Sequence, residues 1–174
     1  RPIYEEVKER AAKESTPEKK RGVGIAWGGY NVTEGIFDQC TVALELLPNG
    51  KFAKYDTWQD QGQGGDVGAL VTTLEALKPL GVTPDDIVLI QNDSKYCPDS
   101  GATASSRQHY MNSKAVVMAA DELMNAMRKP DGTYRTYEEM VAEGIPTKYE
   151  TQYNNPEDMT LKYLDPNTGV GNPT

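Results

Sequence analysis

Histidine and cysteine, which supply many protein metal sites and all disulfides, are scarce in this sequence. Its 174 residues contain one histidine, His109, and two cysteines, Cys40 and Cys97. One histidine cannot form a histidine-rich metal site within this sequence, and two cysteines outside a C-x-x-C spacing do not form a disulfide framework. We therefore predict no metal ligand and no catalytic residue in this chain, and a reduced, cytoplasmic setting.

Positive charge and long apolar runs are also in short supply. Lysine and arginine number 18 against 26 aspartates and glutamates, which gives a net charge of −8 and argues against binding to a phosphate backbone. The longest apolar run, Ala115 to Ala120, is far shorter than the ~20 residues of a membrane-spanning helix. We expect neither nucleic acid nor a membrane as a partner.

The patterns that are present indicate an α+β domain. Alternating apolar residues on either side of Asn49-Gly50 predict a β-hairpin of 41–47 and 52–58. Further strands are predicted at 23–30 and at 87–90, the latter buried, and helices at 3–14, 66–77, 106–128 and 137–143. The helix at 66–77 would bury Val67, Leu70, Val71, Leu74 and Leu77. This order favours a two-layer fold, a mixed β-sheet with helices packed on one face.

The predicted organisation has three parts. Residues 1–21 are interpreted as a helical lead-in with a linker, 22–149 as the main domain, and 150–174 as a loop-rich tail. No strand or helix is predicted after Ile145. The first residue is not methionine and the tail lacks an apolar pattern, so we interpret the sequence as a piece of a larger polypeptide.

Two polar segments each lead from a predicted strand into a predicted helix. Residues 58–66 (WQDQGQGGD) contain glycines that would let backbone N–H groups approach an anion or polar ligand. Residues 92–108 contain small residues, hydroxyls and Arg107, whose guanidinium can hold a phosphate with two hydrogen bonds. We expect the segments to lie side by side at one sheet edge, where ligands of α/β sheets bind.

Both segments also have purely structural interpretations. A strand-to-helix turn would explain the glycines of the first, and Ser105 or Ser106 of the second would serve as a helix N-cap. Known phosphate motifs do not match: residues 61–68 lack the Lys-Ser or Lys-Thr of a P-loop, and residues 22–28 lack the dinucleotide-binding spacing.

Together with further stretches, these segments resemble the molybdenum hydroxylase family, which comprises xanthine dehydrogenases and aldehyde oxidoreductases. The similarity is greatest to bacterial aldehyde oxidoreductases that carry molybdopterin cytosine dinucleotide. The matching stretches, which run from Pro2 to about Tyr149, are 22–28 (GVGIAWG), 61–64 (QGQG), 76–85 (ALKPLGVTPD), 98–107 (PDSGATASSR), 127–130 (MRKP) and 139–144 (EMVAEG).

The resemblance implies that residues 22–149 are part of a molybdopterin-binding domain. In this family the first loop contacts the pterin dithiolene and its phosphate, and the second holds the pyrophosphate and the nucleotide. The implied cofactor-binding residues are Gln61, Gly62, Gln63, Gly64, Ala104, Ser105, Ser106, Arg107 and Gln108.

The resemblance also implies a parent enzyme that hydroxylates an aldehyde or a heterocycle, with 2Fe-2S clusters in other domains. The family's glutamate base, in a Gly-Glu segment, has no counterpart before Thr174. The chain alone is therefore expected to be inactive. Its expected partners are the remaining domains of the parent, including the other half of the molybdenum domain, and a second copy of itself. A non-catalytic cofactor- or nucleotide-binding or assembly module is the alternative.

Overall fold

A computed structural model of the chain describes residues 2–28, 39–104 and 106–154. Contacts divide the chain into a unit of residues 1–34 and a unit of residues 35–174. The predicted binding loops belong to the second unit, and each unit is described by itself.

The first unit contains one helix, α1 (Pro2–Lys13), within the described residues. None of its side chains is buried, in keeping with the narrow apolar stripe of its sequence. The turn that follows is held by an ion pair between Arg21 and Glu14 at 3.3 Å. The strand predicted at 23–30 is wrong for 23–28, which form no strand, and residues 29 and 30 lie outside the described ranges. A strand requires a hydrogen-bonded neighbour, and Trp27 is 93% exposed here.

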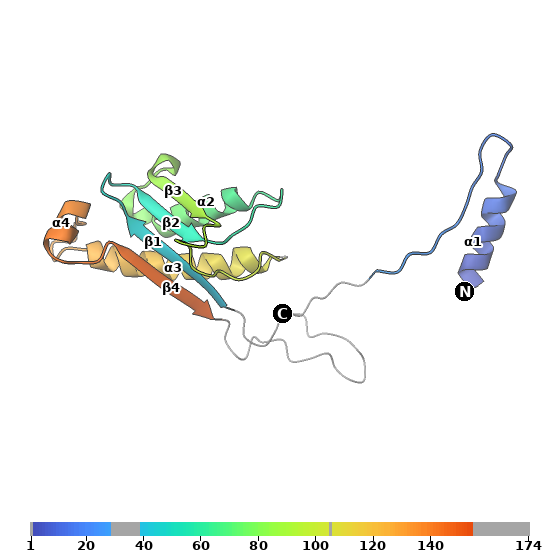
Figure 1. The fold of residues 1–174 in the computed structure, drawn as a ribbon. Coiled ribbons are helices and arrows are strands. Elements are labelled where there is room, and N and C mark those ends of the chain that lie inside the picture. Colours follow the sequence, from blue (N-terminus) through green and yellow to red (C-terminus); the bar gives the residue numbers. More distant parts are fainter. Residues whose placement is uncertain (1, 29–38, 105, 155–174) are drawn as a thin grey trace. The chain divides into compact units, whose positions relative to one another are not determined.

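The second unit is built on a four-stranded mixed sheet with the order β3-β2-β1-β4 (Figure 1). β1 and β2 form the predicted antiparallel hairpin, with Leu44 opposite Lys54 and Gly50 in the turn at φ 78°. β3 pairs with β2 in parallel. The strands are β1 (Gln39–Leu46), β2 (Phe52–Asp56), β3 (Ile87–Gln91) and β4 (Lys148–Asn154).

β4 corrects the expectation that the chain is loop after Ile145, and it crosses the boundary drawn at residue 149. It pairs antiparallel with β1 along its whole length, with Thr151 opposite Val42. Its sequence, KYETQYN, contains no aliphatic residue, so local pattern gave little sign of a strand. Pairing with the free edge of β1 supplies the hydrogen bonds that the local sequence does not predict.

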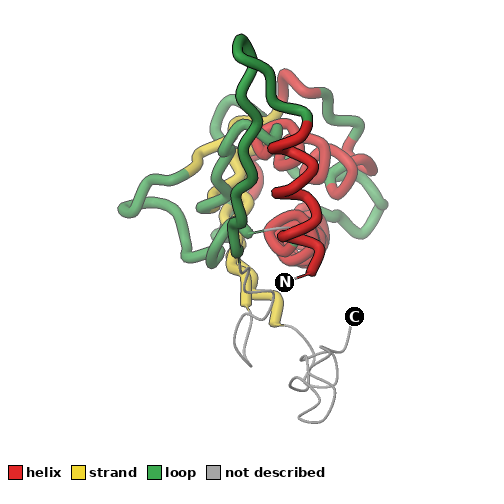
Figure 2. Tube along the Cα trace, turned by 90° about the vertical axis from the view of Figure 1, so that its right-hand side faces the viewer, coloured by secondary structure: helices red, strands yellow, loops and turns green. Residues whose placement is uncertain are grey.

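The helices of this unit are α2 (Gly65–Ala76), α3 (Arg107–Met127) and α4 (Tyr137–Ala142), with short 3-10 turns at Lys78–Leu80 and Pro84–Asp86. α3 packs on β1 and β4, and α2 packs on α3 and β3. Helices and strands therefore form separate layers, coloured red and yellow in Figure 2. The core between them contains Val42, Leu44 and Phe52 from the sheet and Ala115, Ala119 and Leu123 from α3. This arrangement confirms the predicted fold class.

Two details of burial differ from the prediction. Val67 and Val71 of α2 are 64% and 55% exposed, whereas Gly65, Ala69 and Thr73 face the core. β3 is an edge strand whose residues are half-buried and not fully buried. The small side chains on the inner face of α2 allow close packing there. The prediction is therefore wrong for Val67 and Val71, but it is confirmed for Leu77, which is fully buried, while Leu70 and Leu74 are half-buried.

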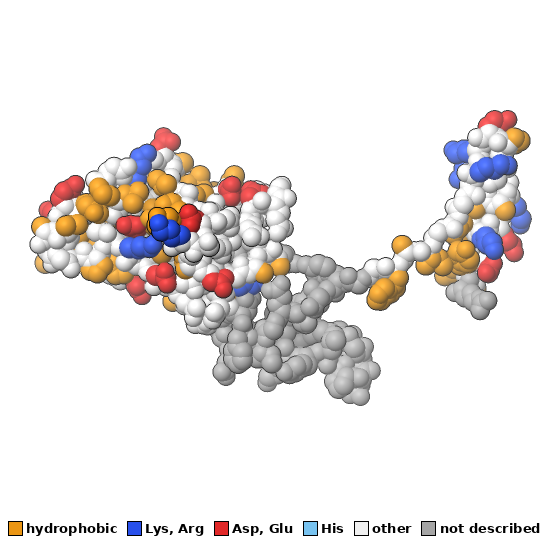
Figure 3. All heavy atoms as spheres, in the orientation of Figure 1, with side chains coloured by type: hydrophobic (Ala, Val, Ile, Leu, Met, Phe, Trp, Pro, Cys, Tyr) orange, Lys and Arg blue, Asp and Glu red, His pale blue; other side chains and the backbone are white. Residues whose placement is uncertain are grey.

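Acidic and basic side chains are interspersed on the face shown in Figure 3, without one large basic patch. No helix within the described ranges is long and apolar enough to cross a membrane.

Candidate functional site

The two predicted loops meet at one cavity. β2 and β3 are parallel neighbours, so the segments that follow their carboxyl ends emerge at the same edge of the sheet. A cavity of about 130 Å³ opens between them, lined by Gln63 and Gly64 of the first loop and by Thr103 and Gln108 of the second. Trp58, Gly65, Gly68 and His109 complete its lining. The predicted side-by-side placement is confirmed.

Direct hydrogen bonds also join the loops. The backbone N–H of Gln59 donates to Thr103 Oγ1 at 3.0 Å. Thr57 and Ser100 exchange two bonds, each backbone N–H donating to the other's hydroxyl at 3.0 Å. Ser100 Oγ in turn donates to the carbonyl of Thr41 on β1 at 2.7 Å. The loops thus form one hydrogen-bonded body attached to the sheet.

Trp58 forms one wall of the cavity and explains the glycines of α2. A Cβ added at Gly65 would lie 2.7 Å from Trp58 Nε1, and one at Gly68 would lie 3.2 Å from the ring. The indole meets the imidazole of His109 edge to face, with ring centroids 5.4 Å apart. The two glycines therefore let α2 approach the indole ring more closely than any other residue would allow.

The amide groups of the first loop are not arranged as an open anion cradle. The Asp60 carboxylate accepts hydrogen bonds from the backbone N–H groups of Gly62, Gly64 and Asp66 at 2.8 to 3.3 Å. The bonds from Gly62 and Asp66 lower the pKa of Asp60 below its ordinary value. The backbone N–H of Gln61 donates to Gln63 Oε1 at 2.6 Å. Acceptors of this chain thus bind the N–H groups of Gln61, Gly62 and Gly64 in this structure, and the contact of these residues with a cofactor stays a prediction.

Arg107 likewise has partners within the protein. Its Nη2 donates to the carbonyl of Gln39 and its Nη1 to that of Ala102, both at 2.7 Å, and Nη1 also reaches the carbonyl of Ser100 at 3.3 Å. The guanidinium packs so closely on Gly101 that a Cβ there would collide with it. In this structure Arg107 holds the second loop together, whereas the sequence predicted a direct grip on phosphate.

Gln108 is the predicted residue that best fits a ligand. Its side chain is 1% exposed and lines the cavity. Oε1 accepts from Arg107 Nη1 at 3.0 Å, but Nε2 has no hydrogen-bond partner among the described residues. A buried amide donor without a partner carries a free-energy cost that a bound acceptor would remove.

The remaining predicted residues lie around the cavity without lining it. These are Gln61, Gly62, Ala104, Ser106 and Arg107, and Ser105 lies outside the described residues. Ser106 stands at the N-cap position of α3, but within the described structure its side chain makes no capping hydrogen bond.

Sequence reasoning missed a pair of buried charges beside the cavity. Lys54 and Asp56 of β2 are both fully buried and form an ion pair at 2.5 Å. Residues 52, 54 and 56 lie on the same face of β2, the face that packs on α3. The position of Phe52 on this face is the one sequence signal that the two charged side chains are buried. Charged residues at alternate strand positions ordinarily indicate a solvent-exposed face.

Among the described residues, no group of three or more histidine, cysteine or acidic side chains could hold a metal ion. Burial raises the pKa of the Cys40 thiol to about 11, so it is almost entirely protonated at neutral pH.

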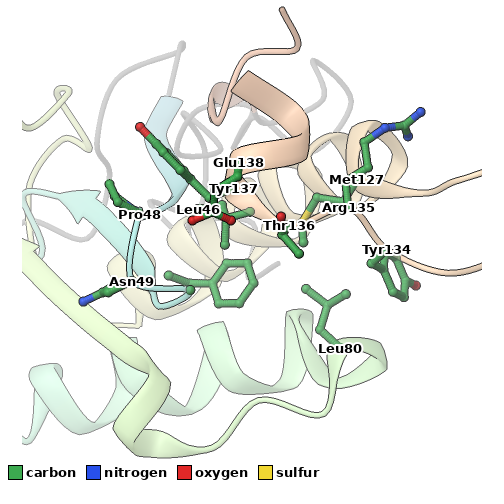
Figure 4. Close-up of a pocket in the computed structure, with 12 residues that line it drawn as sticks. Leu46, Pro48, Asn49, Leu80, Met127, Tyr134, Arg135, Thr136, Tyr137 and Glu138 are labelled. Atoms are coloured by element: carbon green, nitrogen blue, oxygen red, sulfur yellow. The ribbon is translucent and has the colours of Figure 1, made fainter. Parts of the chain in front are cut away.

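A larger cavity of about 500 Å³ lies at the other end of β2 and α3 (Figure 4). Phe52, Leu80 and Met127 contribute apolar side chains to its lining, and Arg135 and Glu138 contribute charged ones. None of the predicted binding residues contributes to it.

Comparison with known proteins gives consistent matches over nearly the whole chain. Residues 1–174 match the family profile described as a molybdopterin cofactor-binding domain. The aldehyde oxidoreductase of Megalodesulfovibrio gigas is 37% identical over 173 residues, which cover 99% of this chain and 19% of that protein. The chain therefore spans about a fifth of that relative's length.

Two solved structures agree. The crystal structure of the aldehyde oxidoreductase from Desulfovibrio desulfuricans is 41% identical with a TM-score of 0.68, over 89% of this chain and 17% of that one. The aldehyde oxidoreductase structure from Desulfovibrio gigas is 36% identical with a TM-score of 0.71, over 98% of this chain and 18% of that one.

Proposed function

The chain belongs to the molybdopterin cofactor-binding domain family, and we propose that it forms part of the cofactor site of an aldehyde oxidoreductase-like molybdenum hydroxylase. The cofactor would be molybdopterin cytosine dinucleotide. When bound in the parent enzyme, the molybdenum would supply the oxidative hydroxylation of an aldehyde or a heterocycle. This chain would position the cofactor, and the catalytic residues would come from other parts of the parent enzyme.

One observation carries this proposal: the buried Gln108 Nε2, which has no hydrogen-bond partner within the described ranges, lies in a cavity between the two loops. A polar ligand with an acceptor atom at this point would satisfy the amide. Gln63 lines the same cavity with its own amide group, which already donates to the carbonyl of Gln59 at 2.9 Å. The site thus fits a ligand rich in hydrogen-bonding groups, as a pterin or a nucleotide is.

The two loops suit different parts of the cofactor. The Asp60 carboxylate already accepts hydrogen bonds from the backbone N–H groups of the first loop, so this loop suits an uncharged part of the cofactor such as the pterin. The second loop leads into the N-terminus of α3, which favours negative charge. We therefore place the pyrophosphate and nucleotide end beside Ala104, Ser105, Ser106 and Gln108, with Arg107 ordering this loop.

The chain spans less than a fifth of the solved aldehyde oxidoreductase structures it matches. The proposed partners are therefore the remaining domains of the parent enzyme, which would carry the 2Fe-2S clusters and the other half of the molybdenum domain.

The test is the substitution Gln108→Leu in the full-length enzyme, which keeps the side-chain volume and removes the amide. Gln152→Leu is the matched control, since Gln152 donates to Thr41 Oγ1 and does not line the cavity. We expect Gln108→Leu to lower the molybdenum content per protein by roughly 10-fold, the loss typical when a buried polar contact to a bound group is removed. Gln152→Leu should leave the content unchanged.

Equal molybdenum contents in the two variants and the unsubstituted enzyme would contradict the proposal. A full-length protein that is isolated free of molybdenum despite an intact cofactor supply would instead support the non-catalytic module.

A further inference from the structure

The ion pair of Lys54 and Asp56 is the centre of a buried hydrogen-bond network. Lys54 Nζ also donates to Asn112 Oδ1 at 2.7 Å, and Asn112 Nδ2 donates to Asp56 Oδ2 at 2.9 Å. The three side chains are 0% exposed, so they form a closed triangle without access to water.

The Asp56 carboxylate joins the elements that carry the candidate site. It accepts from the backbone N–H of Trp58, where the first loop begins, at 3.3 Å. It also accepts from Nε2 of Gln91, where β3 ends and the second segment begins, at 3.1 Å. Asn112 ties it to α3, one helical turn beyond Gln108 and on the same face. One carboxylate thus fixes both loop origins and the helix that presents Gln108.

Stability alone does not explain this arrangement. Burial lowers the pKa of Lys54, and the neighbouring Asp56 opposes that shift. Taking both charges out of water costs free energy that their attraction only partly returns, and buried ion pairs can often be replaced by apolar residues without loss of stability. Hydrogen bonds are directional, so those of this network fix the distances between the groups they join more closely than apolar packing would.

We propose that Lys54, Asp56 and Asn112 are positioning residues that set the separation between Trp58 on the first loop and Gln108 on α3, and so hold the cavity at the width its ligand requires. This inference rests on the proposed cofactor-binding function. It adds that cofactor retention depends on residues that do not line the cavity.

The experiment separates positioning from folding in the full-length enzyme. The triple variant Lys54→Met, Asp56→Leu and Asn112→Leu removes the whole network and leaves no unpaired charge. The control is Lys129→Met with Glu139→Gln, which breaks another ion pair, at 2.6 Å, near the far end of α3. Thermal unfolding, molybdenum content and the rate of molybdenum release are measured for each protein.

We expect the triple variant to keep the thermal midpoint of the unsubstituted enzyme while its molybdenum content falls roughly 10- to 100-fold, the range for residues that orient metal ligands. The control should keep its molybdenum. If the triple variant does not fold, Asn112→Leu decides, because it removes the link to α3 and leaves Lys54 paired with Asp56. Its molybdenum release should be faster at an unchanged midpoint.

A folded variant with the molybdenum content and release rate of the unsubstituted enzyme would overturn the inference. The inference would also be overturned if the control lost molybdenum too, and if in all variants the loss of molybdenum were proportional to the loss of thermal stability. Gln108→Leu separates this failure from that of the proposed function. If it loses molybdenum while the network variants keep theirs, only the positioning role is wrong, and if it also keeps molybdenum, the cofactor site itself is wrong.

Discussion

Gly101 and Arg107 illustrate how single residues determine the second loop. Gly101 has φ 72°, a backbone conformation that side chains with a Cβ rarely adopt. Its missing side chain leaves room for the guanidinium of Arg107, which binds the carbonyls of Gln39 and Ala102. The arginine therefore links the loop to β1, and the missing side chain of Gly101 leaves the space that its guanidinium occupies.

Gly101→Ala should destabilise the protein by roughly 2–4 kcal/mol, because backbone strain and displacement of Arg107 add together. Gly132→Ala is the matched control, since Gly132 also has a positive φ, 87°, but has open space around it. Its cost should be about 1 kcal/mol, from strain alone. Denaturant unfolding measures both, and equal losses at the two glycines would contradict the steric role of Arg107.

Arg107→Ala should weaken cofactor retention in the full-length enzyme more than it changes substrate preference. The reason is that the arginine orders the loop leading to Gln108, the residue proposed to contact the cofactor. Molybdenum content and relative kcat/KM for two aldehydes measure the two effects. An unchanged molybdenum content would count against this role.

At the scale of elements, the sequence predicted those whose partners are close in the chain. The hairpin of β1 and β2 follows from Asn49-Gly50, and α3 from its long apolar stripe. β4 was missed because β1 lies about a hundred residues earlier, and its own residues are polar. The inner face of α2 was missed because it is built from small residues that fit around Trp58.

Gly65→Ala should therefore destabilise the protein, by roughly 1–3 kcal/mol, because the new methyl group would overlap Trp58. A glycine-to-alanine exchange inside a helix ordinarily stabilises a protein by about 0.5–1 kcal/mol. The sign of the change in unfolding free energy therefore distinguishes the overlap with Trp58 from the ordinary helix effect. Gly68→Ala, with its looser 3.2 Å approach to the indole, should be less harmful. Denaturant unfolding with Trp fluorescence tests the order, and a Gly65→Ala protein more stable than its parent would refute the packing.

At the scale of the whole molecule, the site arises from topology. Two loops that are remote in sequence meet because β2 and β3 are parallel neighbours, a pairing that the predicted mixed sheet allowed for. Sequence reasoning identified both loops, and the family resemblance included Gln108 among the residues it implied. It did not identify Asp60 and Arg107 as internal partners of the loops, or Lys54 and Asp56 as buried charges, because these roles depend on three-dimensional neighbours.

A crystal structure of the full-length holoenzyme would show whether the cavity between Gln63 and Gln108 receives the molybdenum cofactor. We expect a cofactor acceptor atom within hydrogen-bonding distance of Gln108 Nε2, with the first loop against the pterin. A structure in which another protein segment satisfies Gln108 Nε2 and the cofactor lies away from both loops would contradict it.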